Sequence, residues 1–340
     1  MEHYIQQWLG IFPFWLVLLA IFACILLLSF GADTMIDGAV ALAQRTGLPH
    51  IIIGATIISL GTTLPEAFVS VMAAWMGNPG LALGNGVGSI IADTGLVFGL
   101  MCLLSPIPLN RFILNRTGWV QIGSATLLVI LAIISWFQTS GIPVIGHKVG
   151  ITFLVLLALY LYVSYYWAKA GGEQVILGEP PTPDAKQSIP KGLFQVIIGL
   201  VLVIVGARFI VPSASEVALR IGVPEDIIAA TIVALGTSLP ELVTGISAVR
   251  KGHPEIMVGN IVGADVLNCL FVIGAAAVAA PLQIPPSFFK FHFPAMMLIL
   301  ISFRVFIAVN QKGRFPQWQG GWLLLIYITY IILQYTLNLT

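Results

Sequence analysis

The chain has 340 residues, of which 58% are hydrophobic and 9% are charged, and its mean hydropathy is +1.00. An ordinary soluble domain carries about 25% charged residues, so this chain has too little polar surface to cover a water-soluble globule. The formal net charge of +1 excludes an electrostatic nucleic-acid binder, which needs a clustered basic surface. Composition therefore indicates a polytopic membrane protein.

Ten long apolar runs follow one another along the chain. A window of about 20 residues, the length of a helix that crosses a bilayer, places them at residues 12–44, 51–75, 82–105, 117–137, 148–168, 192–219, 227–249, 256–280, 288–309 and 319–338. Because residues 1–10 contain no Lys or Arg, the first run is interpreted as a membrane span and not as a signal peptide. The first and sixth runs are longer than a bilayer needs, so we expect those two helices to be tilted or bent.

Basic residues are distributed unequally between the two sides of the predicted membrane. Ten spans put both termini on one side, and the loops of that side hold three basic residues against ten on the other. The three are Lys148, Arg220 and Lys290, and the ten are Arg45, Arg111, Arg116, Lys169, Lys186, Lys191, Arg250, Lys251, Lys312 and Arg314. Cytoplasmic loops carry the excess of Lys and Arg. We therefore expect a protein of the plasma (inner) membrane with both termini outside and the Pro- and Gly-containing linker 169–191 in the cytoplasm.

The chain repeats itself with a displacement of 175 residues. Residues 55–66 read ATIISLGTTLPE, and residues 230–241 read ATIVALGTSLPE. A second element with the pattern Gly-Asn-x-Val-Gly occupies residues 84–88 and, at the same displacement, residues 259–263. This self-similarity predicts that the chain is built from two related halves.

Each copy lies within five predicted spans, which divides the chain into a first repeat (1–168), a short linker (169–191) and a second repeat (192–340). Because five is an odd number, the second repeat starts on the opposite side of the membrane and has inverted topology. Inverted repeats with a binding site at the bilayer midplane are typical of secondary transporters. We therefore expect an all-α polytopic membrane protein whose ten transmembrane helices form two inverted five-helix repeats, with broken helices at the midplane.

The motif Gly-Thr-(Thr/Ser)-Leu-Pro-Glu puts polar residues in the middle of a predicted span in both repeats. Its proline removes a backbone N–H and clashes with the carbonyl four residues earlier, so the helix must break or kink there. The freed carbonyls, two hydroxyls and a carboxylate supply oxygen ligands, which suit hard cations such as Ca²⁺ and Na⁺. The candidate ligands are Thr62, Thr63 and Glu66 in the first copy and Thr237, Ser238 and Glu241 in the second.

The Gly-Asn element opens the next predicted span and adds further polar side chains. Ser89 and Asp93 are four residues apart and share a helix face, and Asn268 is the equivalent of Asp93 in the second repeat. Asp265 is a further acidic residue well inside the paired spans. Asn85 and its copy are either ion ligands or partners of the freed backbone. A cluster of carboxylates left empty must take up protons or cations, which provides a physical basis for exchange.

Other reactive side chains are not assigned to the site. Cys24, Cys102 and Cys269 lie in apolar runs, which argues against a disulfide framework or a zinc site. Arg208 and Arg304 lie within predicted helices, where we expect their long side chains to reach toward the helix ends. The sequence contains neither a nucleophile–base pair nor a His-Glu-x-x-His motif, so we expect no enzyme and no bound cofactor.

The two motifs together resemble the alpha repeats of the Ca²⁺/cation antiporter superfamily, in its sodium/calcium exchanger branch of bacterial and archaeal type. The resemblance is strict over residues 54–99 and 229–274, and the ten-span inverted layout extends it over the whole chain. It implies alternating access, in which Ca²⁺ moves one way and several Na⁺ move the other, while the first and sixth spans slide over the other eight.

The resemblance also implies a ligand set. It assigns Ca²⁺ coordination to Glu66 and Glu241, with Thr62, Thr63, Thr237 and Ser238 as further ligands for Ca²⁺ and Na⁺. Asp93, Asn268 and Ser89 then complete the Na⁺ and central sites.

The second element departs from the family pattern. The family commonly has Gly-Ser-Asn at this point, whereas the first repeat reads Gly88-Ser89-Ile90 and the second reads Gly-Ala264-Asp265. Ala264 removes a hydroxyl ligand, and Asp265 adds a carboxylate that could bind a proton or another cation.

These residues leave one leading hypothesis and two alternatives. The leading one is a secondary antiporter that exchanges Ca²⁺ for Na⁺ within a lipid bilayer, without nucleic acid or an obligate protein partner. A divalent cation/H⁺ exchanger of the same fold is the first alternative, which the acidic second element makes credible. An ion channel is the second, although a channel has no need of inverted repeats.

Overall fold

The structure is a computed structural model that describes residues 8–105, 107–138, 141–175, 188–222, 236, 238–310 and 313–336. Helices make up nearly all of it. In the first half they are α2 (Phe14–Thr46), α3 (His50–Ile53), the π-helix η1 (Gly54–Ile58), α4 (Ser59–Trp75), α5 (Pro79–Ala92), the π-helix η2 (Asp93–Phe98), α6 (Gly99–Leu104), α7 (Arg111–Gln138) and α8 (His147–Val175). In the second half they are α9 (Ile189–Arg220), α12 (Leu239–Arg250), α13 (Pro254–Leu267), the π-helix η4 (Asn268–Val272), α14 (Ile273–Ala279), the π-helix η5 (Phe288–His292), α15 (Phe293–Val309) and α16 (Gln317–Thr336).

These helices confirm the predicted membrane fold. Within the described residues, eight continuous helical runs are long and apolar enough to cross a bilayer, and each matches a predicted span. The tenth predicted span is the 20-residue helix α16. The seventh falls partly on residues 223–235 and 237, outside the described part of the chain, and α12 is its described remainder.

The helix boundaries recur with the 175-residue displacement seen in the sequence. Gly47 and Gly222 follow the ends of α2 and α9, and Gly77 and Gly252 follow the ends of α4 and α12. All four have φ between 69° and 87°, a left-handed conformation that favours glycine and ends a helix. Two helices then begin at equivalent prolines, α5 at Pro79 and α13 at Pro254, where the missing N–H costs nothing.

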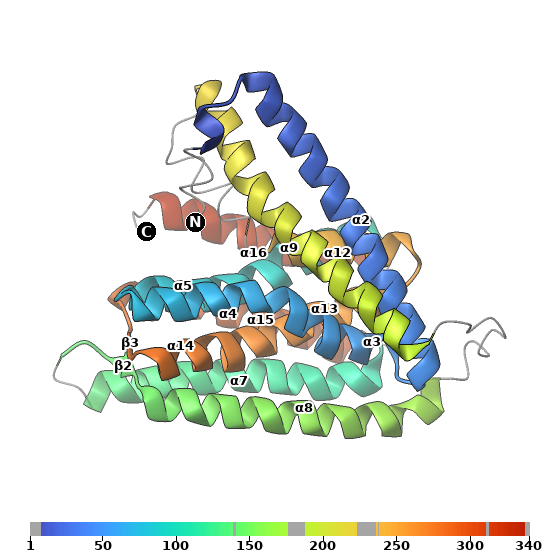
Figure 1. The fold of residues 1–340 in the computed structure, drawn as a ribbon. Coiled ribbons are helices and arrows are strands. Elements are labelled where there is room, and N and C mark those ends of the chain that lie inside the picture. The colour runs from blue at the N-terminus through green and yellow to red at the C-terminus, as the bar shows by residue number, and fades with distance from the viewer. Residues whose placement is uncertain are drawn as a thin grey trace.

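Two helices, α2 and α9, cross the rest of the molecule obliquely (Figure 1). They contain 33 and 32 residues, and a helix of that length spans about 50 Å, well beyond the roughly 30 Å of a hydrocarbon core. Their length and their oblique course agree with the prediction that the first and sixth spans are tilted or bent (Figure 1).

The α2 and α9 helices are antiparallel and pack tightly through glycines. A Cβ atom at Gly31 would lie 2.9 Å from the carbonyl oxygen of Gly199, and one at Gly38 would lie 2.6 Å from that of Gly192. Small residues of this kind let membrane helices approach closely. The two longest helices therefore form one paired unit against the other elements.

The helix of the first motif is not broken at its proline. Helix α4 continues through Pro65, and the irregular backbone lies about two turns earlier, in the wide turn of η1. A proline removes only one helical hydrogen bond, the one to Gly61, so a packed membrane helix can continue past it. In the second repeat, α12 has Pro240 at its beginning.

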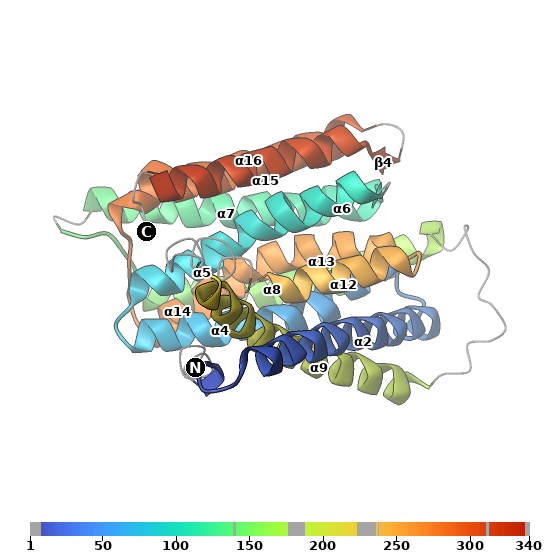
Figure 2. The ribbon, with the colours of Figure 1, turned by 90° about the horizontal axis from the view of Figure 1, so that it is seen from above.

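The remaining helices stack in layers beside the α2–α9 pair (Figure 2). One large apolar core runs through them, includes Ile90, Phe98 and Val262, and extends to Met35 of α2. Two short antiparallel strand pairs join the two halves of the chain: β1 (Ile107–Pro108) pairs with β4 (Arg314–Phe315), and β2 (Val144–Ile145) with β3 (Leu282–Gln283).

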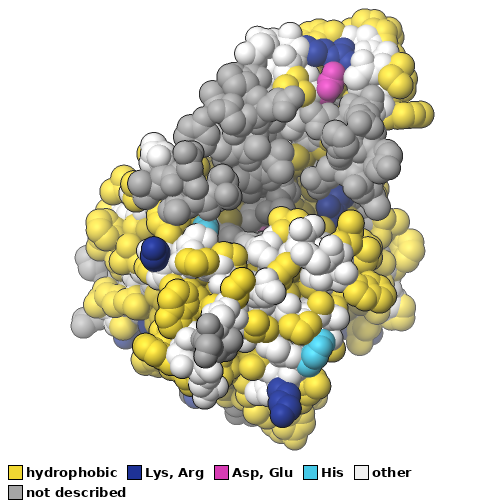
Figure 3. Space-filling view, turned by 90° about the vertical axis from the view of Figure 1, so that its left-hand side faces the viewer, with side chains coloured by type: hydrophobic (Ala, Val, Ile, Leu, Met, Phe, Trp, Pro, Cys, Tyr) yellow, Lys and Arg dark blue, Asp and Glu magenta, His cyan; other side chains and the backbone are white. Residues whose placement is uncertain are grey.

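The outer surface is apolar, as a lipid-facing surface must be. Large side chains such as Trp75, Phe137 and Val155 are 74%, 82% and 62% exposed. On the face shown in Figure 3, hydrophobic side chains cover much of the described surface, and Lys and Arg occur at a few separate places. Such a surface would be an aggregation hazard in water but is the expected one in a bilayer.

Candidate ion-binding site

The two Gly-Thr-(Thr/Ser)-Leu-Pro-Glu motifs lie in the interior of the bundle. Thr62, Thr63 and Glu66 are on α4 and are 0%, 0% and 4% exposed. Ser238 precedes α12, Glu241 is in its first turn, and both are 2% exposed. The predicted ligand Thr237 lies outside the described residues. Both motif carboxylates are thus withdrawn from solvent and from the lipid-facing surface.

The second elements of the two repeats bring their polar residues to the same region. Ser89 is on α5, Asp93 begins η2 and Asn268 begins η4, and all three are buried. The side-chain amide of Asn268 donates to Asp93 Oδ2 at 3.3 Å, and the Thr62 hydroxyl lies 3.4 Å from Asn260 Oδ1. Each contact joins one repeat to the other.

Glycines allow these elements to approach one another closely. A Cβ atom at Gly259 of α13 would lie 2.0 Å from the carbonyl oxygen of Ile51, and one at Gly263 would lie 2.4 Å from that of Ala55. No side chain fits at those distances. The glycines of the second Gly-Asn element therefore let α13 lie directly against α3 and η1, which places Asn260 beside the first motif.

Glu66, Asp93, Glu241 and Asp265 form one electrostatic group. Glu66 and Glu241 are close enough to interact electrostatically, and Asp93 interacts with Glu241, Asp265 and Glu66. Buried like charges repel strongly, because the surrounding medium screens them poorly. The group therefore has to bind positive charge, as protons or as metal cations.

Most of the predicted ligands have a buried oxygen without a hydrogen-bond partner. These oxygens are Thr63 Oγ1, Glu66 Oε2, Ser89 Oγ, Asp93 Oδ1, Ser238 Oγ, Glu241 Oε2, Asp265 Oδ1 and Asn268 Oδ1. Native proteins pair the great majority of buried polar atoms, because an unpaired one costs about 1–3 kcal/mol. Eight unsatisfied oxygens on residues selected from two sequence motifs have the chemistry of a ligand set for a hard cation.

The described residues do not form a metal site built from carboxylates alone. Within the described part of the chain, no three His, Cys, Asp or Glu side chains are grouped so that they could hold one metal ion together. A cation bound here would use one or two carboxylates and complete its coordination with hydroxyl, amide and backbone oxygens. Na⁺ and Ca²⁺ accept such mixed oxygen ligands readily.

Asp265 has partners that were not predicted. Its Oδ2 accepts hydrogen bonds from the Thr94 hydroxyl and from the Gln121 side-chain amide, both at 2.5 Å. Gln121 is on α7 and is 3% exposed. A lone glutamine in an apolar span is a signal in the sequence, but its partner lies 144 residues away. Asp265 thus connects the acidic group to α7.

Asn85 has a structural role in this structure. Its side-chain amide donates to the carbonyl oxygen of Glu66 at 3.1 Å and to the Ser70 hydroxyl at 2.9 Å. Of the two roles open to this residue, the structure shows it bound to backbone, and this contact fixes α5 against α4 next to Glu66.

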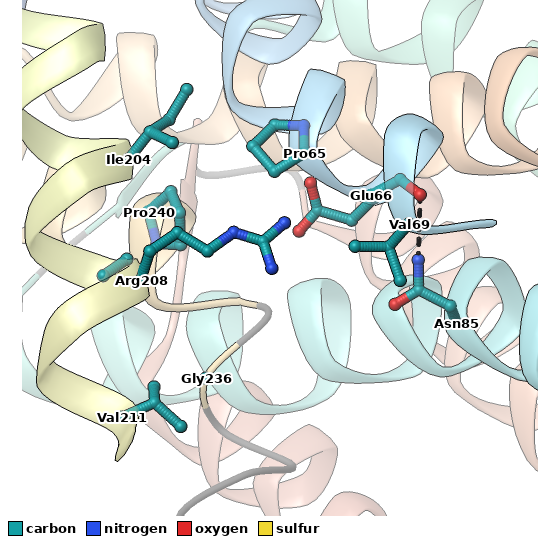
Figure 4. Close-up of a pocket in the computed structure, with 10 residues that line it drawn as sticks. Pro65, Glu66, Val69, Asn85, Ile204, Arg208, Val211, Gly236 and Pro240 are labelled. Carbon is teal, nitrogen blue, oxygen red and sulfur yellow. Dashed lines mark hydrogen bonds between the residues drawn. The ribbon is translucent and has the colours of Figure 1, made fainter. Parts of the chain in front are cut away.

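Two cavities reach the site. The smaller, about 50 Å³, lies between α4 and α9 and is lined by Glu66, Asn85, Pro65, Pro240 and Arg208, among others (Figure 4). The larger, about 560 Å³, lies between α5, η5 and α16 and is lined by Ser89, Asn85, His292, Tyr327 and Tyr330, among others. Asn85 borders both; the smaller cavity reaches Glu66, and the larger one reaches Ser89.

Arg208 is placed differently from the sequence prediction. It lies well inside α9, and its guanidinium group points toward Glu66 and not toward a helix end (Figure 4). Arg304 points away from the site, since it donates to Asn115 Oδ1 at 3.1 Å and lies over the Trp119 ring. Helix α9 crosses the bundle obliquely, so residues in its middle lie close to the acidic group. The sequence alone does not show where two helices cross.

Comparison with known proteins agrees with this architecture. The family profile described as "Sodium/calcium exchanger protein" matches residues 16–166 and 191–336. The sodium/calcium exchanger MaX1 of Methanosarcina acetivorans is 26% identical, covering 89% of this chain and 93% of its own length. The inner membrane protein YrbG of Escherichia coli is 31% identical, covering 85% and 89%.

Solved structures give the same result. A structure of the sodium-calcium exchanger NCX_Mj, soaked with 2.5 mM Na⁺ and 1 mM Sr²⁺, is 26% identical and superposes with a TM-score of 0.76. It covers 93% of this chain and 98% of its own. The profile covers both halves of the chain and the fold agrees over nearly its whole length, so the chain belongs to the sodium/calcium exchanger family of membrane antiporters.

Proposed function

We propose that this protein exchanges Ca²⁺ for Na⁺ across a membrane by alternating access, through the site between α4, α5, α12 and α13. One observation carries the proposal: eight buried oxygens without hydrogen-bond partners belong to the two repeated motifs and lie around one acidic group. The family to which the chain belongs supports the same ions.

The motif residues divide into two kinds of ligand. Glu66 and Glu241 supply the charge that a divalent ion needs, and the hydroxyls and carbonyls of Thr62, Thr63, Thr237 and Ser238 complete the coordination of Ca²⁺ and Na⁺. Ser89, Asp93 and Asn268 extend the site toward the second elements and bind Na⁺. Charged and neutral oxygens in one site can serve both ions, because Na⁺ tolerates neutral oxygens and Ca²⁺ favours carboxylates.

Electrostatics explains why such a site exchanges ions and does not leak them. Two carboxylates 4 Å apart repel by about 4 kcal/mol at an effective dielectric constant of 20. A site that releases Ca²⁺ without taking up Na⁺ keeps this repulsion in a region where water cannot screen it. The change between access states is therefore most favourable when the site is loaded.

The paired helices α2 and α9 are the elements suited to change access. They pack on each other through glycines and cross the other helices obliquely (Figure 1). A pair held together in this way can slide as one body and uncover the site from one side and then from the other.

A divalent cation/H⁺ exchanger is the second candidate, and Asp265 is the observation that favours it. One oxygen of this carboxylate accepts two hydrogen bonds, while the other is buried without a partner. A carboxyl group in that position can hold a proton in place of a metal cation.

The excess of basic residues in one set of loops supports a plasma-membrane protein with both termini outside and the linker 169–191 in the cytoplasm. Ca²⁺, Na⁺ and the lipid bilayer are its proposed partners, with H⁺ as the alternative counter-ion.

Uptake of Ca²⁺ into proteoliposomes tests the function. Vesicles loaded with Na⁺ are compared with vesicles that carry only an outward H⁺ gradient. The proposal requires uptake that depends on internal Na⁺ and disappears in Glu66→Gln and in Glu241→Gln. The matched control is Glu216→Gln, which alters a glutamate that pairs with Arg220 on α9 and lies outside the site; it should retain uptake. Uptake that follows the pH gradient and ignores Na⁺ would instead establish the proton-coupled alternative.

A further inference from the structure

Arg208 is a positive charge in a site that binds cations. It lines the 50 Å³ cavity together with Glu66, Pro65 and Pro240 (Figure 4). The oxygen Glu66 Oε2 is buried without a hydrogen-bond partner, so no hydrogen bond stabilises the negative charge at that atom. The guanidinium therefore lies on the α9 side of the carboxylate that the proposed function assigns to Ca²⁺.

The repeat shows that this charge is specific to one half of the molecule. Arg208 is displaced by 175 residues from Asp33, so a cation on α9 occupies the position of an anion on α2. Asp33 accepts a hydrogen bond from the Ser247 hydroxyl at 2.5 Å, and Lys251 donates to its backbone oxygen at 3.0 Å. Asp33 is thus tied to α12, whereas Arg208 faces the acidic group.

A fixed cation beside an ion site acts on ions according to their charge. The Coulomb energy is proportional to the product of the two charges, so Arg208 repels Ca²⁺ twice as strongly as Na⁺ at the same position. When no ion is bound, the same guanidinium partly balances the carboxylates.

We propose that Arg208 is a specificity-determining residue, a built-in cation that weakens Ca²⁺ binding more than Na⁺ binding and so allows Na⁺ to displace Ca²⁺. This inference rests on the proposed function, because it concerns the ions of the same site. It requires that removal of the charge raises the affinity for a divalent ion by a certain factor. This factor is the square of the one by which the affinity for a monovalent ion rises.

Equilibrium binding to the purified full-length protein in detergent tests the inference without any transport step. Dissociation constants for Ca²⁺ alone and Na⁺ alone are measured by calorimetry for the wild type, Arg208→Gln and Arg208→Lys. We expect Arg208→Gln to bind Ca²⁺ about tenfold more tightly and Na⁺ about threefold more tightly, and Arg208→Lys, which keeps the charge, to remain near the wild type.

The control is Arg304→Gln. It removes an arginine within another membrane helix, where the guanidinium contacts Asn115 and Trp119, and it should change neither constant. A second readout is the thermal stability of the ion-free protein, which should fall in Arg208→Gln and recover more on addition of Ca²⁺ than in the wild type.

Three results would overturn the inference. If Arg208→Gln binds Ca²⁺ no more tightly than the wild type, the guanidinium does not compete with the ion. If Ca²⁺ and Na⁺ affinities change by equal factors, or Arg208→Lys behaves like Arg208→Gln, the residue supports the packing of α9 and does not act through its charge. Failure of the proposed function would appear separately, as absence of Na⁺-dependent uptake by the wild type.

Discussion

Asn268 Nδ2 donates to Asp93 Oδ2 at 3.3 Å, and these two residues occupy the same position in the two repeats. The contact therefore joins a carboxylate to its own symmetry equivalent, which in this chain is an amide. Of the two equivalent positions, only Asp93 carries a negative charge. Each residue has one buried oxygen without a hydrogen-bond partner, Asp93 Oδ1 and Asn268 Oδ1. The pair lies where the two halves of the proposed site meet.

Exchange of the two residues should be tolerated better than loss of the charge. Asp93→Asn removes a charged hydrogen-bond acceptor worth about 1.5–3 kcal/mol, so we expect the Na⁺ concentration for half-maximal exchange to rise tenfold or more. The double variant Asp93→Asn/Asn268→Asp restores one carboxylate to the pair and should recover much of the activity. Na⁺-dependent Ca²⁺ uptake measures both, and a double variant as impaired as Asp93→Asn would contradict the equivalence of the two positions.

Gly259 should not accept a side chain. A Cβ atom there would lie 2.0 Å from the carbonyl oxygen of Ile51, so Gly259→Ala forces α13 away from α3, at a cost of about 1–3 kcal/mol. We expect a lower thermal unfolding temperature in detergent and loss of exchange. Gly123→Ala on α7 is the control, because a Cβ atom at this exposed position meets no described atom within 4 Å. Equal unfolding temperatures for the two variants would refute the packing argument.

Asp265→Asn should leave the fold intact and change the counter-ion dependence. The substitution conserves shape and hydrogen-bonding positions for Thr94 and Gln121 but removes one negative charge from the acidic group. We expect an altered dependence of Ca²⁺ uptake on Na⁺ and on external pH. Thr94→Val is the control, since it removes a hydrogen bond to the same oxygen and keeps the charge. An ion-activation profile unchanged in Asp265→Asn would show that this carboxylate takes no part in coupling.

A covalent link between α2 and α12 should stop transport. Lys251 Nζ lies 2.5 Å from Asp37 Oδ1, and the two side chains are 26% and 54% exposed. A pair this exposed contributes only about 0.2–1 kcal/mol, so Asp37→Asn alone should have little effect. The double variant Asp37→Cys/Lys251→Cys, joined by a short bis-methanethiosulfonate through two disulfide bonds, should lose Ca²⁺ uptake, because α2 can no longer slide. Reduction of the disulfides should restore uptake.

The control for this link keeps both cysteines on one helix. Glu216→Cys/Arg220→Cys replaces an ion pair within α9, so its cross-link does not join the α2–α9 pair to the other helices. If the link between α2 and α12 leaves uptake unchanged, these helices do not move relative to each other during exchange.

The amino-acid sequence determined the features that depend on local composition and on repetition. The length of the apolar runs located the membrane helices, because a helix needs about 20 apolar residues to cross a bilayer. The 175-residue displacement identified the two motifs, and their described polar residues are buried in the interior of the bundle. The sequence could not predict that α4 continues through Pro65, since surrounding helices decide whether a proline breaks a membrane helix.

Only the tertiary structure decided which distant side chains meet. Gln121 contacts Asp265 across 144 residues of chain, and Arg208 faces Glu66 because α9 crosses the bundle obliquely (Figure 1). Hydropathy and residue spacing describe one helix at a time. The depth and rotation at which two helices cross depend on the close packing of small residues along both, and this packing determined which charges lie next to the proposed ion site.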